Sequence, residues 1–310
     1  MNFLVAGGAG FIGSHLCELL LDNDHSVICV DNYVTGTFDN VAHLESRPGF
    51  TVIEHDITAP LPQMLGIDGV LHLASVASPI NYMKWPVETL KAGSYGTFAL
   101  LDLAAANDAI FLLASTSEVY GEPAVHPQTE DYWGYVNPVG PRSVYDEAKR
   151  FAEAATMGYR RSQSVDTKIV RIFNTYGPRM ASDDGRVIPA LVSQALQGEP
   201  LTLFGDGSQT RSFCYISDLV EGIYRMLLST ELGPINLGNP TEMTVSELAD
   251  SIVRLTGSRS AVVYQQLPQD DPTRRRPDIS LATERLQWKP LVSFDDGLRR
   301  TIEWFREHGA

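Results

Sequence analysis

The chain has 310 residues, of which 44% are hydrophobic and 20% charged, and its 38 acidic and 24 basic residues give a net charge of −14. This length and composition are typical of a globular protein with one large domain or two modest ones. The negative charge argues against a general nucleic-acid-binding surface, because such a surface needs clustered cations.

The chain begins with a strand-like run instead of a secretion signal, and no apolar run approaches the length of a membrane span. We therefore expect a cytoplasmic protein without membrane contact. Cys17, Cys29 and Cys214 are widely spaced in apolar or helical patterns, which favours buried thiols over a disulfide framework or a zinc site.

The first expected element is a buried strand from Phe3 to Ala6, followed by a glycine-rich turn and a helix that begins near Phe11. The turn reads Gly8-x-Gly10-x-x-Gly13, the spacing of a dinucleotide-binding turn. Its glycines permit a tight turn, let backbone N–H groups approach a pyrophosphate and let the helix pack against the strand. The positive end of the helix then faces the phosphates.

The second strand, from Val27 to Val30, ends in Asp31. In dinucleotide-binding folds an acidic side chain at this place, about 20 residues after the glycines, hydrogen-bonds the adenosine ribose. Because a carboxylate there repels a 2′-phosphate, the sequence favours NAD over NADP.

Further strand-like runs follow at residues 51–55, 70–74 and 110–115, separated by segments that can form helices. Alternating strands and helices with nearly continuous apolar strands predict a parallel sheet covered on both faces. We therefore expect an α/β fold, a Rossmann-like doubly wound sheet. The helical segments 87–106 and 144–161 have wide apolar faces for the core or for a partner subunit.

Such sheets bind ligands at the carboxyl ends of their strands, so Asp31, Asp56, Ala74 and Thr116 are expected on one rim above the glycine turn. Asp56 there has two interpretations. It could accept a hydrogen bond from the adenine amino group, or it could cap a helix that starts before Thr58.

From about residue 175, prolines and glycines break the pattern into short pieces. We expect an NAD-binding domain over residues 1–174 and a smaller mixed α/β substrate-binding lobe over residues 175–310. Segments at about 215–238 are expected to return to the first domain. They are a helix with Ser217-Asp218 as its N-cap and a short strand from Pro234 to Gly238.

Tyr145 and Lys149 lie four residues apart, so on a helix they share a face. A cation at about 4 Å from a phenol, at an effective dielectric of about 20, is worth roughly 4 kcal/mol or about three pKa units. The phenolate of Tyr145 should then be accessible near neutral pH. Tyr145 is thus a candidate base for an alcohol that loses hydride to NAD, and Lys149 a candidate ligand for the ribose.

The string Ser115-Thr116-Ser117-Glu118-Val119-Tyr120-Gly121 follows a central strand. A hydroxyl there can hydrogen-bond the same substrate oxygen that Tyr145 deprotonates. The alternative, a Ser/Thr-rich strand end that caps a turn, explains the hydroxyls but gives Glu118 no purpose.

Together GGAGFIGSH, VDN, STSEVYG, YDEAKR, RIFNTYGPRM, GSQTRSFCYISDLV and NLGNP resemble the extended short-chain dehydrogenases/reductases that act on nucleotide sugars. SEVYGEPAVHPQTEDYWGYVNPVGPRSVYDEAKR, GRVIPALVSQALQGEPLTLFGDGSQTRSF and DDPTRRRPDI are similar, more narrowly, to the UDP-glucuronate decarboxylases, or UDP-xylose synthases. The similarity covers almost the whole chain. One departure is Gly93, where relatives commonly have asparagine.

The resemblance implies that Tyr145 and Thr116 assist oxidation of the sugar at C4 by NAD, that carbon dioxide then leaves, and that returned hydride gives UDP-xylose. No metal is required. Ser117 stands where sugar 4,6-dehydratases have an aspartic acid. A UDP-sugar 4-epimerase and a catalytically silent sensor of nucleotide sugar or NAD(H) remain alternatives.

The resemblance also assigns substrate contacts. Glu118 would orient the substrate or handle a proton, Arg275 would hold the departing carboxylate, and Tyr82 would touch the sugar carboxylate. The three consecutive arginines 274–276 could equally form a solvated face, and Tyr82 a part of the core or rim. Nucleotide diphosphate or loop contacts are implied for Asn174, Arg186 and Arg211, although Arg186 could simply start a helix.

The resemblance implies a homodimer that pairs through the helix bearing Tyr145 and its neighbouring helix. The turn, the rim and the Tyr145–Lys149 pair together give the expected NAD contacts, which are Gly7, Gly8, Gly10, Phe11, Ile12, Gly13, Asp31, Asn32, Thr35, Gly36, Asp56, Ile57, Leu73, Ala74, Tyr145 and Lys149.

Overall fold

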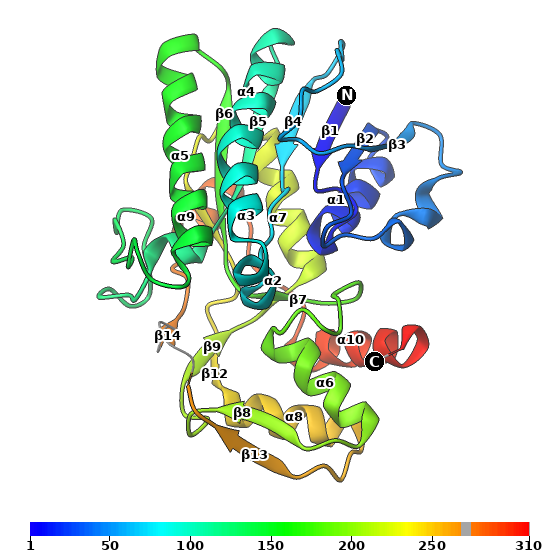
Figure 1. The fold of residues 1–310 in the computed structure, drawn as a ribbon, viewed down its shortest axis with the longest axis vertical. Helices are drawn as coiled ribbons and strands as arrows, with labels where there is room; N and C mark the ends of the chain where they lie inside the picture. The colour runs from blue at the N-terminus through cyan, green and yellow to red at the C-terminus, as the bar shows by residue number, and fades with distance from the viewer. Residues whose placement is uncertain (268–273, 310) are drawn as a thin grey trace.

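A seven-stranded, wholly parallel sheet forms the larger lobe of the protein (Figure 1). The computed structural model describes residues 1–267 and 274–309, so Asp270 to Thr273 of the string DDPTRRRPDI lie outside the described residues. The strand order is β11-β6-β5-β4-β1-β2-β3, with β1 Asn2–Ala6, β2 Ser26–Asp31, β3 Phe50–Glu54, β4 Gly69–His72, β5 Ile110–Thr116, β6 Thr167–Ile172 and β11 Ile235–Leu237.

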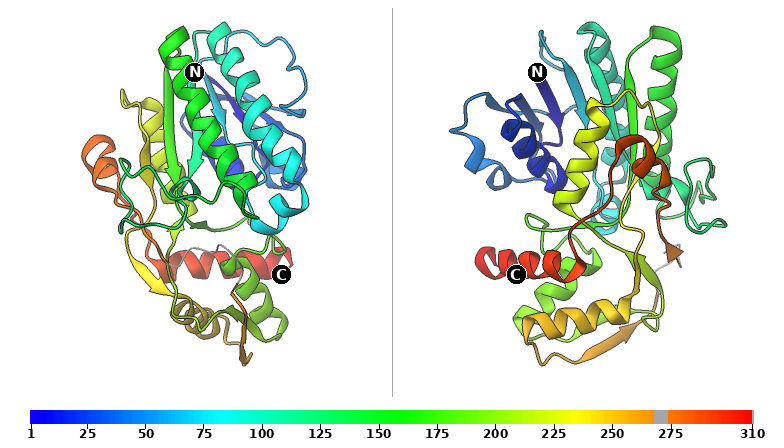
Figure 2. Two further views of the ribbon diagram at one scale, coloured as in Figure 1. Left: turned by 60° about the vertical axis from the view of Figure 1, so that its left-hand side comes forward. Right: turned by 180° about the vertical axis from the view of Figure 1, so that it is seen from behind.

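Helices cover both faces of this sheet, which confirms the predicted doubly wound fold (Figure 2). The central strands are apolar and buried because each face packs on helices. One face carries α4 and α5, and the other carries α1 and α7. The helices of this lobe are α1 Phe11–Asp22, α2 Pro79–Lys84, α3 Pro86–Lys91, α4 Thr97–Ala106, α5 Ser143–Gln163, α7 Ile216–Leu228 and α9 Ser280–Leu286.

The segment expected as one helix over 87–106 is interrupted by a π-helical turn, Ala92–Gly96, between α3 and α4. Gly93 in this turn is buried against α5, and a Cβ added to it would lie 2.6 Å from the Cβ of Ala148. The glycine therefore lets the turn approach the helix that carries Tyr145 and Lys149.

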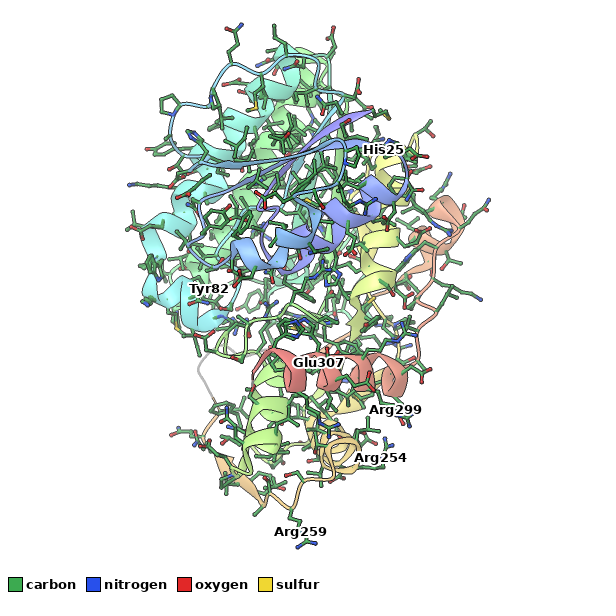
Figure 3. The ribbon with its side chains drawn as sticks, turned by 90° about the vertical axis from the view of Figure 1, so that its right-hand side faces the viewer. His25, Tyr82, Arg254, Arg259, Arg299 and Glu307 are labelled. Atoms are coloured by element: carbon green, nitrogen blue, oxygen red, sulfur yellow. The ribbon has the colours of Figure 1, made fainter. Side chains whose placement is uncertain are left out.

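In the part of the chain that the structure describes, the smaller lobe consists of helices and short strands (Figure 3). Figure 3 shows α10, which carries Arg299 and Glu307, lying across this lobe on the side that faces the sheet. Its elements are α6 Val187–Gln197, α8 Val245–Thr256, α10 Phe294–His308, β8 Leu201–Phe204, β9 Thr210–Ser212, β12 Glu242–Thr244, β13 Val262–Gln265 and β14 Arg274–Arg275. The parallel pair β7 Thr175–Tyr176 and β10 Cys214–Tyr215 connects the lobes.

The expected strand at 234–238 is present as β11, which pairs with β6 and so belongs to the large sheet. The predicted cap at Ser217-Asp218 is wrong, because α7 begins at Ile216 and its N-cap is Tyr215. The carboxylate of Asp218 instead accepts hydrogen bonds from the backbone N–H groups of Leu291 and Val292, at 3.0 and 2.9 Å.

Within residues 1–267 and 274–309, no helix is long and apolar enough to cross a membrane. The same residues contain no cluster of three or more histidine, cysteine or acidic side chains that could hold a metal ion. The three cysteines are buried free thiols.

Candidate active site

A cavity of about 1030 Å³ lies at the carboxyl ends of the sheet strands and extends to the smaller lobe. Every site residue expected from the sequence lines this cavity except Gly8. The fold therefore brings together side chains that are far apart in the chain, among them Asp31, Thr116, Tyr145 and Arg275.

The glycine turn is built so that backbone atoms form one wall of the cavity. Gly7 has a φ of +79°, and a Cβ on Gly13 would lie 2.0 Å from the carbonyl oxygen of Gly7. Gly8 is placed differently from our expectation, since a Cβ there would point away from the cavity and lie 2.6 Å from the Sγ of Cys29. Gly7, Gly10 and Gly13 thus line the cavity, and Gly8 permits close packing beneath it.

Asp31 is fixed at the end of β2 by the backbone around it. Its carboxylate accepts hydrogen bonds from the N–H groups of Ala9, at 3.0 Å, and Tyr33, at 2.9 Å. Burial nevertheless raises the pKa of this carboxyl above its usual range. The buried carboxylate of Asp31 is suited to hydrogen-bond the adenosine ribose of NAD. The adjacent glycine turn, which has no side chains in the way, is suited to bind the pyrophosphate.

Asp56 lies beside Asn32 on the same rim. One oxygen accepts from the backbone N–H of Thr58 at 2.8 Å, and the other from the Asn32 side chain at 3.2 Å. The residues after Asp56 form a turn and not a helix, so the helix-cap interpretation is wrong. Asp56, Ile57, Thr35 and the other expected rim contacts border the part of the cavity nearest Asp31.

Tyr145 and Lys149 share the buried face of α5, as their spacing predicts. The Thr116 side chain faces the Tyr145 hydroxyl and acts to lower the pKa of that phenol. The Lys149 Nζ atom donates to the carbonyl oxygen of Ala114 at 2.9 Å and lies 5.9 Å from the centre of the Tyr145 ring. Thr116 also accepts a hydrogen bond from the backbone N–H of Glu118, at 3.2 Å.

The prediction that Lys149 alone brings the Tyr145 phenol to a neutral pKa is wrong. Burial raises the pKa of Tyr145 above its ordinary value, and burial lowers the pKa of Lys149 to about 8. Desolvation disfavours the charged forms of both side chains and is the largest cause of both shifts. The protein alone therefore holds Tyr145 as a neutral phenol.

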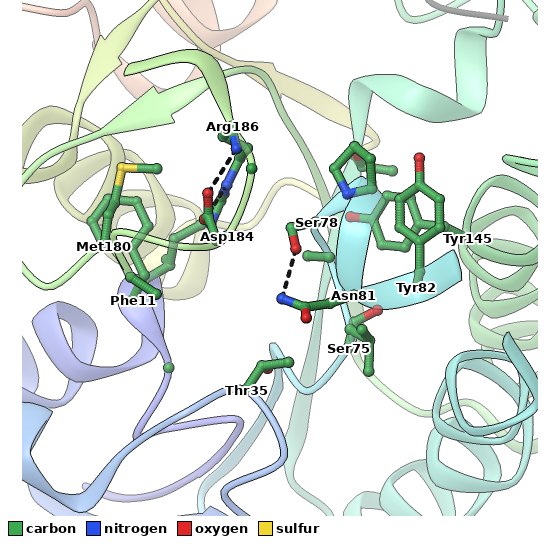
Figure 4. Close-up of a pocket in the computed structure, with 18 of the residues that line it drawn as sticks. Phe11, Thr35, Ser75, Ser78, Asn81, Tyr82, Tyr145, Met180, Asp184 and Arg186 are labelled. Carbon is green, nitrogen blue, oxygen red and sulfur yellow. Dashed lines mark hydrogen bonds and ion pairs between the residues drawn. The ribbon is translucent and has the colours of Figure 1, made fainter. Parts of the chain in front are cut away.

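Tyr82 lies directly against Tyr145 (Figure 4). The two rings are stacked with an angle of 4° between their planes, and the Tyr82 hydroxyl is buried without a hydrogen-bond partner among the described residues. Its burial again raises the pKa of the phenol above the usual range. Tyr82 thus offers a neutral hydroxyl at the cavity wall. This position agrees with its interpretation as a rim residue.

Glu118 is held between two arginines. It forms an ion pair with Arg275 from β14, and its other oxygen lies 3.1 Å from the Nη2 atom of Arg142. These guanidinium groups lower the pKa of Glu118 to about 2 against the effect of burial. Ser117 next to it is buried and also lines the cavity.

Sequence reasoning missed Arg142. It precedes Tyr145 by three residues, just before α5, and only this proximity to the base could have indicated it. The three consecutive arginines are now distinguished, because Arg275 is buried and lines the cavity whereas Arg274 is exposed and Arg276 is half-buried on an ion pair with Glu242.

The smaller lobe contributes Arg186 and Arg211 to the lining of the cavity. Arg186 is the N-cap residue of α6, its side chain pairs with Asp184, and its guanidinium lies over the Phe11 ring at 5.9 Å (Figure 4). Both interpretations of Arg186 are thus compatible with its position. Asn174 lines the cavity between β6 and β7, where its carbonyl accepts from the Cys214 N–H at 2.9 Å.

The chain is similar to known proteins over its whole length. The model of the NAD dependent epimerase/dehydratase family matches residues 3–238. UDP-glucuronic acid decarboxylase 1 of Danio rerio is 50% identical over 312 aligned residues, which cover 100% of this chain and 74% of the relative. UDP-glucuronic acid decarboxylase 6 of Arabidopsis thaliana is 50% identical over 99% of this chain and 89% of its own length.

Solved structures share the fold. The UDP-glucuronic acid 4-epimerase of Bacillus cereus, in complex with UDP-glucuronic acid and NAD, superposes with a TM-score of 0.88. It is 30% identical, and the superposition covers 99% of each chain.

Proposed function

The chain belongs to the NAD-dependent epimerase/dehydratase family, as its motifs predict, and on this premise we propose that it decarboxylates UDP-glucuronate to UDP-xylose with bound NAD. The observation that carries this proposal is the ion-paired Glu118, which Arg142 and Arg275 hold beside the stacked Tyr82 and Tyr145. Half of all positions are identical in relatives named for this activity.

The glycine turn, Asp31 and Lys149 would hold the cofactor. NAD supplies a hydride acceptor and donor for C4 of the sugar, and its positive nicotinamide ring favours ionisation of a nearby phenol. Tyr145 takes the proton of the 4-hydroxyl, and Thr116 keeps that oxygen in place. Proton transfer to a buried phenol thus occurs only when the site is loaded.

Oxidation at C4 creates a ketone β to the C6 carboxylate. The C5–C6 bond then breaks, its electron pair moves into an enolate, and carbon dioxide leaves. The enolate oxygen stays within reach of the Tyr145 and Thr116 hydroxyls, which stabilise the developing charge. A proton that comes ultimately from solvent is added at C5. The return of hydride to C4 and of the Tyr145 proton to the C4 oxygen then gives UDP-xylose.

The arginines give the site its preference for an acidic sugar. Two guanidinium groups face the carboxylate of Glu118 at the cavity, and guanidinium groups are well suited to bind the uronate carboxylate of the substrate. Arg142 joins Arg275 and Tyr82 as a proposed contact of that group. Arg186 and Arg211, which also line the cavity, are proposed to bind the diphosphate.

The second candidate is a UDP-sugar 4-epimerase, which the similarity to the Bacillus cereus structure favours. Incubation of the purified protein with UDP-glucuronate and NAD, followed by mass spectrometry, separates the candidates. A product lighter by one carbon dioxide supports decarboxylation, whereas an isomer of unchanged mass that separates from UDP-glucuronate on chromatography supports epimerisation. Absence of any turnover would support the sensor alternative.

Tyr145→Phe is the matched variant, because it keeps the ring stack and removes only the hydroxyl. We expect it to lower kcat by about 10²- to 10⁴-fold, the usual contribution of a general base. Retention of full turnover by this variant would remove Tyr145 from the mechanism.

We also propose a homodimer that pairs through α3, α4 and α5. Apolar side chains on this face are exposed in the single chain, including Val87, Leu90, Tyr95, Phe98 and Phe151. Burying such a patch is a common cause of dimer formation. Light scattering of the purified protein, with Phe98→Glu as the variant that should give monomers, tests the pairing.

Location in the cytoplasm stays a prediction, for which cell fractionation is the test.

A further inference from the structure

We propose that Gln128 is a positioning residue, which holds the backbone of β14 so that Arg275 faces Glu118. Gln128 is 1% exposed and is not among the residues that line the cavity, so it acts through Arg275 and not on the substrate. This inference rests on the proposed function only for the role of Arg275.

Gln128 forms a clamp on the residues that follow Arg275. Its backbone N–H donates to the carbonyl of Arg276 at 2.9 Å, and its side-chain oxygen accepts from the N–H of Arg276 at 2.9 Å. Its carbonyl accepts from the N–H of Asp278, also at 2.9 Å. Three hydrogen bonds with one buried residue thus fix the backbone N–H and carbonyl of Arg276 and the backbone N–H of Asp278.

The Gln128 side chain is itself oriented by a second contact. Its amide nitrogen donates to the carbonyl of Val125 at 2.9 Å, which leaves the amide oxygen free to face Arg276. A buried amide with both ends satisfied is rigid, because any rotation leaves polar groups unpaired in the interior.

The other edge of β14 is held by the smaller lobe. Arg275 pairs in register with Arg211 of β9, and the Ser212 hydroxyl donates to the Arg275 carbonyl at 3.3 Å. The strand is only two residues long, so β9 alone leaves it with one neighbour. Gln128 supplies the second.

Gln128 is tied in turn to the large sheet. The Asn236 amide on β11 donates to the carbonyl oxygens of Gln128, at 3.0 Å, and Asp278, at 3.1 Å. Asn236 also accepts from the hydroxyl of Tyr120 at 2.8 Å. Tyr120 ends the turn that Ser117 and Glu118 begin, so Gln128 places the strand of Arg275 relative to the turn of Glu118.

The test is a set of variants in which the Gln128 clamp and Arg275 are changed singly and together. Gln128→Met keeps the length of the side chain and removes its donor and acceptor, and Arg275→Met removes the guanidinium. Each is made alone, with the other, and in the Tyr145→Phe protein, in which turnover should be about 10²- to 10⁴-fold slower. Asn107→Leu is the matched control, because Asn107 also donates to and accepts from backbone groups but lies outside the cavity.

We expect Gln128→Met to lower kcat for UDP-glucuronate by about 10- to 100-fold, since a displacement of about 1 Å has effects of this size. The Kd for UDP-glucose should change by less than about threefold, because UDP binding does not involve the clamp. In the Arg275→Met protein the same substitution should lower kcat by less than about threefold. An equal loss in both backgrounds, or the same loss in Asn107→Leu, would overturn the inference.

The second readout needs no turnover. In the Tyr145→Phe protein, calorimetry gives the ratio of the Kd values for UDP-glucose and UDP-glucuronate. Gln128→Met and Arg275→Met should reduce this preference for the acidic sugar by similar factors, and the double change should reduce it no further. An unchanged preference in Gln128→Met alongside a lost one in Arg275→Met would contradict the positioning role.

These measurements also separate the two proposals. The wild-type protein could form no UDP-xylose while Gln128→Met and Arg275→Met still reduce the sugar preference by similar factors. This outcome would contradict the proposed function and support the role of Gln128. If Gln128→Met does not fold, Gln128→Glu is used for the same cycle, because it keeps the acceptor for the Arg276 N–H. It should then retain more of the sugar preference than Arg275→Met does, and an equal loss would overturn the inference.

Discussion

The phenol rings of Tyr82 and Tyr145 form a parallel stack with their centroids 5.4 Å apart. The stack joins α2 to α5 at the cavity wall and leaves the Tyr82 hydroxyl buried without a partner among the described residues. One side chain thus both supports the proposed base and presents a donor to the substrate.

Two substitutions of Tyr82 separate these roles. Tyr82→Phe keeps the stack, so we expect kcat for a bound substrate to fall less than the preference for UDP-glucuronate over UDP-glucose. That preference should fall by about tenfold or more, the worth of one hydrogen bond to a charged group. Tyr82→Ala also removes the stack, worth about 0.5–1.5 kcal/mol, and should lower kcat further. Steady-state kinetics would contradict this view if both variants lost kcat equally.

Glu118→Gln should lower kcat, and the factor by which kcat falls should be the same at every pH from 5 to 9. The wild-type carboxyl has its pKa lowered to about 2, so it is ionised throughout this range and does not shape the pH profile. The variant also breaks an ion pair in a buried place, which costs about 3–5 kcal/mol of folding stability. Glu221→Gln, which removes the surface carboxylate paired with Arg225, is the control and should change little. If the acidic limb of the pH profile moved only in Glu118→Gln, proton transfer by Glu118 would be indicated instead.

Gly13→Ala should abolish NAD retention, because its Cβ would lie 2.0 Å from the Gly7 carbonyl oxygen. The backbone of the turn would have to move, and its N–H groups would then no longer point toward the phosphates of NAD. Gly158→Ala is the matched substitution, since a Cβ on this α5 residue meets no heavy atom within 4 Å. It should stabilise the fold by about 0.5–1 kcal/mol and leave NAD binding unchanged. Gel filtration with absorbance detection and thermal melts measure both effects.

Asp146→Asn should stabilise the protein increasingly as the pH rises from 4 to 7. Burial and the neighbouring Glu118 raise the pKa of Asp146 to about 7, and its Oδ1 atom is buried without a partner among the described residues. The unfolded state ionises near its ordinary value of about 3.9, so the folded acid loses stability across this window. At about 1.4 kcal/mol per pKa unit the gain is on the order of 2–4 kcal/mol above pH 7 and close to zero below pH 4. Denaturant unfolding at both pH values would contradict this if the gain were independent of pH.

Much of the sheet and of the cofactor rim follows from local patterns. The apolar runs that become β1, β2 and β5 are buried on both faces, so their composition alone identifies them. The carboxyl ends of parallel strands lie on one edge, which is why Asp31 and Thr116 meet in the same cavity.

The remainder depends on contacts between distant segments. Nothing local indicates that Gln128 clamps Arg276, because their pairing exists only after the smaller lobe has returned to the sheet. The pKa of Tyr145 was also beyond the sequence, since spacing gives the neighbouring cation but not the desolvation that is the largest cause of the shift. Asp218 shows the same limitation, because a residue typical of helix caps binds the backbone of Leu291 and Val292 instead.

The pairing of β11 with β6 has a consequence for biosynthesis. β7, α6 and α7 precede β11 in the chain, so they are synthesised before β11 can pair with β6 at the edge of the sheet. A truncated polypeptide that stops at residue 174 would leave the unpaired edge of β6 open to pairing with other chains, which is a route to aggregation. A fragment cut at residue 174 therefore lacks one strand of its own sheet, and a longer fragment that includes β11 is needed to complete the nucleotide-binding half.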